Sequence, residues 1–137
     1  MNHEIHPAVN QVEIHPFHQQ TSAIQTMRRY QVQPEAWGPL SEGQRNIFHH
    51  RLLSKIAARY GKSTAQIILR WNIQRGVVVI PKSTRKERME ENMNIWDFTL
   101  DSRDMDAIAA LDIGYSEIIN HYSSSTARAL NAMKIHL

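Results

Sequence analysis

Residues 82–92 gather the side-chain types that bind anions. Four cations and two hydroxyls follow directly on an apolar stretch: Lys82, Ser83, Thr84, Arg85, Lys86 and Arg88. We expect a helix to begin here, and its free backbone N–H groups and dipole favour a bound anion. Arginine can also donate two parallel hydrogen bonds to a phosphate group. The segment is therefore a candidate phosphate site, although the same residues also fit a solvated helix start whose Arg and Glu side chains pair on the surface.

Histidine pairs raise the question of a metal. His15 and His18 are three residues apart, and His49 and His50 are adjacent. No cysteine or well-spaced carboxylate completes a ligand set, and adjacent side chains on a helix diverge. We therefore expect no metal site. His15 is expected to be a strand-end residue that bonds to the backbone.

Two further features are weaker. Trp37 is the last residue of a predicted strand. It is either a stacking platform for a ligand or a core aromatic, and composition favours the core. Gln11 and Glu13 share one face of a strand, a functional hint if that face points into a barrel. Trp71 and Trp96 are expected to pack in the core. No tyrosine lies at a strand end beside a lysine, so the spacing identifies no general acid.

The elements that must position these residues alternate between strand and helix. Apolar spacing predicts strands over Val9–His15, Gln33–Trp37 and Val77–Ile80, with a very short fourth over Phe98–Leu100. The third is uniformly apolar and β-branched, which is typical of a strand covered on both faces. Carboxyl ends of parallel strands are where ligands bind, so residues 15–18, 37–43 and 82–92 are the places to look for a site.

Helices are predicted between the strands. Capping-box spacing marks three starts: Ser22 with Gln25, Ser63 with Gln66, and Thr84 with Glu87. Asp101 and Ser125 are single candidate caps. An apolar stripe from Phe48 to Tyr60 stops at Gly61, a candidate left-handed C-terminal cap. Other side chains expected to face inward are Ile24, Met27, Ile68, Leu69, Met89, Met93, Met105, Ile108 and Leu111.

This alternation predicts an α/β protein with about four βα units and a parallel sheet. Four units could form a small open sheet or half of a closed barrel, since a full (β/α)8 barrel needs roughly 250 residues. No internal repeat or linker divides the chain, so residues 1–137 are treated as one unit.

Composition excludes several classes of protein. The 137 residues are 42% hydrophobic and 21% charged, which is ordinary for a globular domain. The absence of cysteine excludes disulfides and thiolate catalysis, and is compatible with the cytoplasmic location that we expect. No stretch is long enough to span a membrane. The net charge of +3 is mild, and Glu87, Glu90 and Glu91 interrupt the basic run, so we expect no nucleic-acid partner.

Three segments together resemble the aldo-keto reductase family. Asn10–Phe17 (NQVEIHPF) is similar to that family's fifth barrel strand and its exit, and Glu35–Leu40 (EAWGPL) to the sixth. Ile80–Thr84 (IPKST), with Arg88, Glu91 and Asn92, resembles the seventh strand and cofactor loop. The match covers nearly the whole chain and is nearest to the bacterial members that include 2,5-diketogluconate reductase. It implies the C-terminal half of a (β/α)8 TIM barrel.

The resemblance also implies an NADPH site. By this resemblance, Gln11 bonds the nicotinamide carboxamide and Trp37 stacks on the nicotinamide ring. The loop of Gly38, Pro39 and Leu40 passes the pyrophosphate. The 2′-phosphate of the adenosine is held by Lys82, Ser83 and Arg88, which implies NADPH over NADH, and Thr84 belongs to the same cofactor-binding loop. Glu91 and Asn92 meet the adenine. Gly38 stands where many members have serine, so any hydroxyl contact there is lost.

The family's catalytic aspartate, tyrosine, lysine and histidine come from its first four barrel strands, and none has a counterpart here. Residues 1–6 resemble a helix–strand connection inside such a barrel, whereas residues 135–137 resemble a natural family ending. We therefore expect the C-terminal half of an NADPH-dependent carbonyl reductase, inactive alone and with an unspecified small carbonyl substrate. Tyr115 and Tyr122 either line a substrate pocket or simply pack.

The alternative is a non-catalytic nucleotide-binding half-barrel. A half-barrel leaves two unpaired strand edges. The missing N-terminal half or a second copy of the chain would pair with them.

Overall fold

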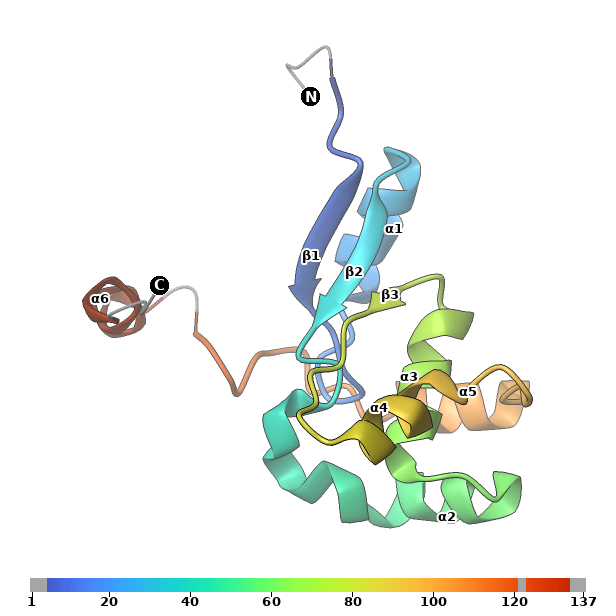
Figure 1. Cartoon of the computed structure of the whole chain (residues 1–137). Coiled ribbons are helices and arrows are strands. Elements are labelled where there is room, and N and C mark those ends of the chain that lie inside the picture. The colour runs from blue at the N-terminus through green and yellow to red at the C-terminus, as the bar shows by residue number, and fades with distance from the viewer. Residues whose placement is uncertain (1–4, 121–122, 134–137) are drawn as a thin grey trace.

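Three parallel strands form the sheet in the computed structural model, which describes residues 5–120 and 123–133 (Figure 1). β1 (Val9–Glu13), β2 (Gln33–Trp37) and β3 (Val78–Val79) lie in the order β1-β2-β3. Both pairs are parallel, with Gln11 opposite Glu35 and Ala36 opposite Val79. Parallel neighbours need a crossover connection, and helices supply it for both pairs. The α/β class with parallel strands is confirmed.

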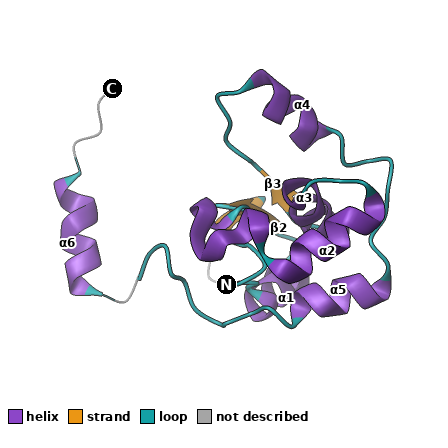
Figure 2. Cartoon of the chain, turned by 90° about the horizontal axis from the view of Figure 1, so that it is seen from below, coloured by secondary structure: helices purple, strands orange, loops and turns teal. Residues whose placement is uncertain are grey.

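The helices begin and end close to their expected positions. They are α1 (Thr21–Arg29), α2 (Arg51–Tyr60), α3 (Thr64–Gln74), α4 (Lys86–Met93), α5 (Ser102–Ala109) and α6 (Ser124–Ala132). Between β2 and α2 lies η1 (Ser41–His49), a run of 3₁₀ turns broken by left-handed backbone. Figure 2 shows α4 and α6 standing out from the body formed by the other helices and the sheet.

Several predicted caps are confirmed. Ser63 Oγ accepts the Gln66 N–H, and the Gln66 side chain accepts the Ser63 N–H, so α3 begins with a complete capping box. Gly61 ends α2 in the left-handed conformation (φ 61°) that glycine adopts without a steric penalty. Asp101 caps α5 by accepting the Asp104 N–H.

Other caps are wrong by one or two residues. α1 follows a left-handed Gln20 and has no side-chain cap, so the pairing of Ser22 with Gln25 does not form. α4 begins only at Lys86, so Arg85 rather than Thr84 holds its Ncap position, and no side chain caps it. Ser123, rather than Ser125, caps α6. Local spacing permits each of these caps, but the path of the chain into the helix decides which residue holds the Ncap position.

The fourth predicted strand is absent from the described residues. Leu100 is buried, yet its backbone pairs with a side chain: Leu100 N–H donates to Gln74 Oε1 (2.7 Å), and Gln74 Nε2 donates to the Leu100 carbonyl (2.9 Å). The Gln74 amide thus satisfies the groups that a neighbouring strand would otherwise bond. About four βα units were expected, and the sheet has three strands.

The core lies between the sheet and α1, α2 and α3. Ile14, Ala36 and Val77 reach it from the strands or their ends, and Ile68 and Trp71 reach it from α3. Ile24 and Met27 of α1 are buried as expected. The parallel sheet is thus covered by helices on the side of this core.

The region around β3 is far less covered than predicted. Val77 is buried, but Val78 and Ile80 are 40% and 46% exposed, because β3 is the edge of the described sheet. Met89 and Met93 were expected inside, and Trp96 was expected in the core, but all three are exposed. A short edge strand offers little apolar surface for them to pack on. Tyr122 and residues 1–4 and 134–137 lie outside the described residues.

Candidate functional site

A cleft of about 440 Å³ opens where β3 leads into α4. Its walls come from η1 and the residue before it, from the start of α3, and from the loop and helix after β3. The lining residues are Leu40, Phe48, His49, Ser63, Ala65, Lys82, Ser83, Thr84, Arg85, Arg88, Glu91 and Asn92. The candidate phosphate segment is thus one wall of a cavity rather than a flat helix start.

A second cavity of about 290 Å³ adjoins this cleft. Its lining includes Gly38, Pro39 and Ile80, and it shares Leu40, Phe48 and Lys82 with the cleft. The predicted loop after β2 and the predicted loop after β3 therefore face a common depression. Of the predicted site residues, only Gln11 and Trp37 lie outside the lining of these two cavities.

Gln11 and Trp37 lie on one face of the sheet. Gln11 is exposed and its Nε2 donates to Glu35 Oε1 (2.6 Å). Trp37, at the end of β2, is half-buried and stands opposite Glu13 in the register. Trp37 is absent from the apolar core cluster of the described residues, so the expectation of a core aromatic is not met.

Gly38 makes the turn out of β2. Its φ of +59° is a conformation that side chains rarely adopt, and a Cβ would meet Ile118 Cδ1 at 3.6 Å. Glycine in place of serine removes a possible hydroxyl contact at this position, but glycine is also the residue that adopts this backbone conformation most readily.

Basic side chains dominate the cleft. Among the described residues, no carboxylate oxygen lies within 4.0 Å of the cationic nitrogens of Lys82, Arg85 or Arg88. Ser83 Oγ accepts the Arg85 N–H (3.1 Å), which shapes the turn before α4. Unpaired cations beside a cavity are suited to an anionic ligand.

Phe48, His49, Ser63 and Ala65 line the cleft without having been predicted as site residues, whereas Arg85 belongs to the candidate phosphate segment. Phe48 was expected on the apolar stripe of a helix, but it precedes α2 and is 43% exposed. Nothing in the local sequence marks the residues from η1 and α3 as part of a site, because their place in the cleft depends on how η1 and α3 pack against the loop after β3.

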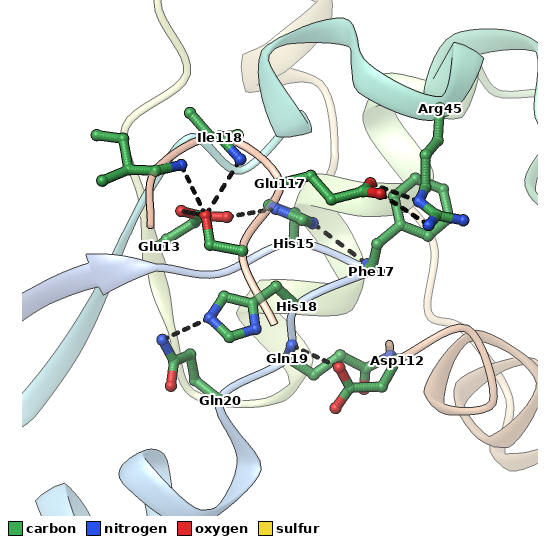
Figure 3. Close-up of polar contacts among 12 residues, drawn as sticks. Glu13, His15, Phe17, His18, Gln19, Gln20, Arg45, Asp112, Glu117 and Ile118 are labelled. Atoms are coloured by element: carbon green, nitrogen blue, oxygen red, sulfur yellow. Dashed lines mark hydrogen bonds and ion pairs between the residues drawn. The ribbon is translucent and has the colours of Figure 1, made fainter. Parts of the chain in front are cut away.

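A buried polar network closes the end of β1 (Figure 3). His15 Nε2 lies 3.0 Å from Glu13 Oε1, and His15 Nδ1 accepts the Phe17 N–H (3.2 Å). The expected backbone bond of His15 is therefore present. Glu13 Oε2 accepts the Ser116 hydroxyl (2.7 Å), which joins β1 to a distant part of the chain. Burial lowers the pKa of His15, which favours the neutral imidazole that accepts the Phe17 N–H.

An ion pair extends the same contact. Arg45 of η1 binds both carboxylate oxygens of Glu117, at 2.5 and 2.8 Å, and this guanidinium holds the pKa of Glu117 below its usual value. Ser116 therefore attaches this part of the chain to the end of β1, and Glu117 attaches it to η1. A cavity of about 700 Å³ lies beside them, and Tyr115 and His18 line it.

No metal centre is found in the part of the chain that the structure describes: no three His, Cys, Asp or Glu side chains are grouped as ligands. The adjacent histidines lie in different surroundings. His49 lines the cleft, whereas the His50 ring packs edge-on against Phe17 at 5.5 Å. Among the described residues, no helix is long and apolar enough to cross a bilayer.

Comparison with known proteins identifies the fold family. The aldo/keto reductase family model matches residues 1–113, which include β1 through α5 and every residue that lines the cleft. The chain belongs to the aldo/keto reductase family. The expected family resemblance and the expected partial α/β barrel are thereby confirmed.

Relatives of this aldo/keto reductase are longer than the chain. Methylglyoxal reductase DkgA of Escherichia coli K12 is 41% identical over 108 residues, which are 79% of this chain and 39% of that protein. The chain therefore spans about two-fifths of the length of such relatives.

Two solved structures have similar folds. An aldo-keto reductase from a Medee basin deep-sea metagenome library is 38% identical with a TM-score of 0.80, over 83% of this chain and 42% of that one. A mutant of Gox0644 in complex with NADPH is 31% identical with a TM-score of 0.79, over 96% of this chain and 45% of that one.

Proposed function

We propose that this chain forms the NADPH-binding half of an aldo/keto reductase that reduces small carbonyl compounds. The observation that carries this proposal is the cleft beside α4. Lys82 and Ser83 line this cleft from the loop before α4. Arg88, Glu91 and Asn92 line it from α4 itself. The 2′-phosphate of NADPH is a dianion near neutral pH, and unpaired basic side chains are its natural partners.

The sheet would hold the other end of the cofactor. Gln11 Nε2 is engaged by Glu35, which fixes the amide and leaves Oε1 as the atom to accept the N–H of the nicotinamide carboxamide. The half-buried ring of Trp37 offers a face on which the nicotinamide can stack. Gly38 allows the chain to turn closely between these two parts of the site.

The chain by itself is proposed to be inactive. When bound, NADPH supplies a hydride, but reduction of a carbonyl also needs a group that gives a proton to the oxygen. The family residues that do so have no assigned counterpart in residues 1–137. Purified chain should therefore bind NADPH without oxidising it when carbonyl compounds are added. Carbonyl-dependent loss of absorbance at 340 nm, in protein free of host reductases, would contradict this proposal.

Arg88 gives the sharpest test of the binding site. Replacing Arg88 with Ala removes charge-assisted hydrogen bonds to the 2′-phosphate, and we expect NADPH to bind about 10- to 100-fold more weakly. NADH lacks this phosphate, so its affinity should hardly change. Arg103→Ala is the matched control, because Arg103 is an exposed arginine on α5 that does not line the cleft. Equal losses for NADPH and NADH, measured by fluorescence titration, would rule out the 2′-phosphate assignment.

A second candidate is a nucleotide-binding half-barrel that assembles with another half-barrel. The supporting observation is the open sheet, since β1 and β3 are its edges and Val9 and Val78 are 50% and 40% exposed. A second copy of the chain would be one way to pair these edges. Sedimentation velocity that finds only monomer over the micromolar range would exclude the dimer.

A further inference from the structure

Helix α4 carries much of the cleft wall but is poorly anchored by apolar contacts. None of its side chains is buried, and it has no side-chain N-cap. A cavity of about 360 Å³, lined in part by Met89, Met93 and Val78, lies between α4, α3 and β3. Figure 2 shows α4 standing out from the body between two loops. Since helices in proteins owe most of their stability to packing of an apolar face, something else must fix the position of α4.

Gln66 provides such a connection. It lies in the first turn of α3, is 6% exposed, and its Nε2 donates to two carbonyls at the end of α4: Glu91 (3.1 Å) and Asn94 (2.8 Å). The same amide accepts the Ser63 N–H through Oε1 (2.9 Å). One buried side chain therefore joins the N-terminus of α3 to the C-terminal turn of α4, where the Glu91 carbonyl also accepts the Asn94 N–H (3.1 Å).

The bonds of Gln66 end on the turn that faces the cleft. Glu91 accepts one of them through its backbone, and both Glu91 and Asn92 line the cavity. We propose that Gln66 is a positioning residue for the cofactor: it fixes the last turn of α4, and thereby the side chains that would meet the adenosine. This inference rests on the proposed NADPH site and assigns a role to a residue outside the cleft lining.

Gln74, at the other end of α3, is a matched control. Its amide also accepts one backbone N–H and donates to a backbone carbonyl, but both belong to Leu100 and neither reaches α4. Gln66→Met removes three such bonds and Gln74→Met removes two, each with little change in volume and no change in charge. Both variants are expected to lose stability, so stability alone cannot separate a positioning role from a structural one.

Two measurements on the full chain make that separation. Hydrogen exchange of residues 90–94 should accelerate in Gln66→Met and stay near the wild-type rate in Gln74→Met. Dissociation constants for both NADPH and NADH should rise by about tenfold in Gln66→Met, since the adenosine contacts are common to both, and stay within about twofold in Gln74→Met. This pattern differs from that of Arg88→Ala, which should affect NADPH alone.

Gln66→Glu serves if Gln66→Met fails to fold. It keeps an oxygen for the Ser63 N–H and loses only the donor, and its NADH affinity should recover as the pH is lowered and the carboxyl gains a proton to donate. Unchanged exchange of residues 90–94, or equal loss of affinity in the Gln66 and Gln74 variants, would overturn the role of Gln66. Wild-type chain that binds neither cofactor would instead overturn the proposed function, and with it the consequence for affinity, whatever the exchange shows.

Discussion

Helices α3 and α4 are neighbours in the fold, but different interactions hold them. α3 buries seven residues, among them Ile67, Ile68 and Trp71, and begins with a complete capping box. α4 buries none, has no side-chain cap, and is tied at its C-terminal turn by Gln66. The helix that lines much of the candidate site is therefore the less firmly packed one. Apolar burial supplies the stable body, and a few directed bonds place the residues that would touch a ligand.

The largest expected effect tests this contrast in packing. Ile68 is fully buried in α3, so Ile68→Ala should lower the free energy of unfolding by about 2–5 kcal/mol. Met93 of α4 is 71% exposed, and Met93→Ala should change the free energy of unfolding by less than about 0.5 kcal/mol. Urea titration followed by tryptophan fluorescence measures both. Similar losses in the two variants would mean that α4 is packed as firmly as α3.

A smaller effect comes from the buried network beside the packed body. Burial lowers the pKa of His15 below 6.5, against opposing contributions from Glu13 and Glu117, so the unfolded chain takes up a proton at a higher pH than the folded chain does. The free energy of unfolding should therefore fall as the pH drops below about 6.5, by at most about 1.4 kcal/mol per pH unit. Above that pH both states are neutral at this residue and the effect vanishes.

Comparison of the wild-type chain with His15→Gln isolates this contribution. For the wild-type chain, the urea midpoint should be lower at about pH 5.5 than at about pH 7.5. For His15→Gln, the difference between these two midpoints should be smaller. Asp97 and Glu117, whose pKa values are lowered by hydrogen bonds from Lys62 and Arg45, titrate below this range and do not interfere. Equal pH dependence in the two proteins would show that His15 is not responsible.

The smallest expected effect concerns the exposed face of α4. Lys86 Nζ lies 3.7 Å from Glu90 Oε1, and the two side chains are 81% and 67% exposed. Water screens the attraction between such exposed charges. Lys86→Ala should leave the urea midpoint and the hydrogen exchange of residues 90–94 unchanged within error. A clear acceleration of that exchange would mean that α4 depends on its own surface pair as well as on Gln66.

The candidate site was predictable in part from sequence. The segment from Lys82 to Arg88 was recognisable because cations and hydroxyls follow an apolar strand, and all of these cations and hydroxyls except Lys86 line the cleft. Residues from the start of α3 and from η1 carry no such signal. They reach the cleft because the crossover between β2 and β3 folds them against it. The exposure of Trp96 was missed for the related reason that sequence does not reveal which surfaces stay uncovered.

The sequence alone determined the features that depend on near neighbours in the chain. The bounds of β2, the capping box of Ser63 with Gln66, and the left-handed end of α2 at Gly61 were all predicted, because alternation, caps and glycine act within a few residues.

Only the tertiary structure decided the long-range pairings. Ser116 bonds Glu13 across 103 positions, and Gln66 bonds the Asn94 carbonyl across 28. The physical reason is that a polar side chain can be satisfied by any donor or acceptor that packing brings near it. Its type reveals the need for a partner, and only the fold reveals which partner it has.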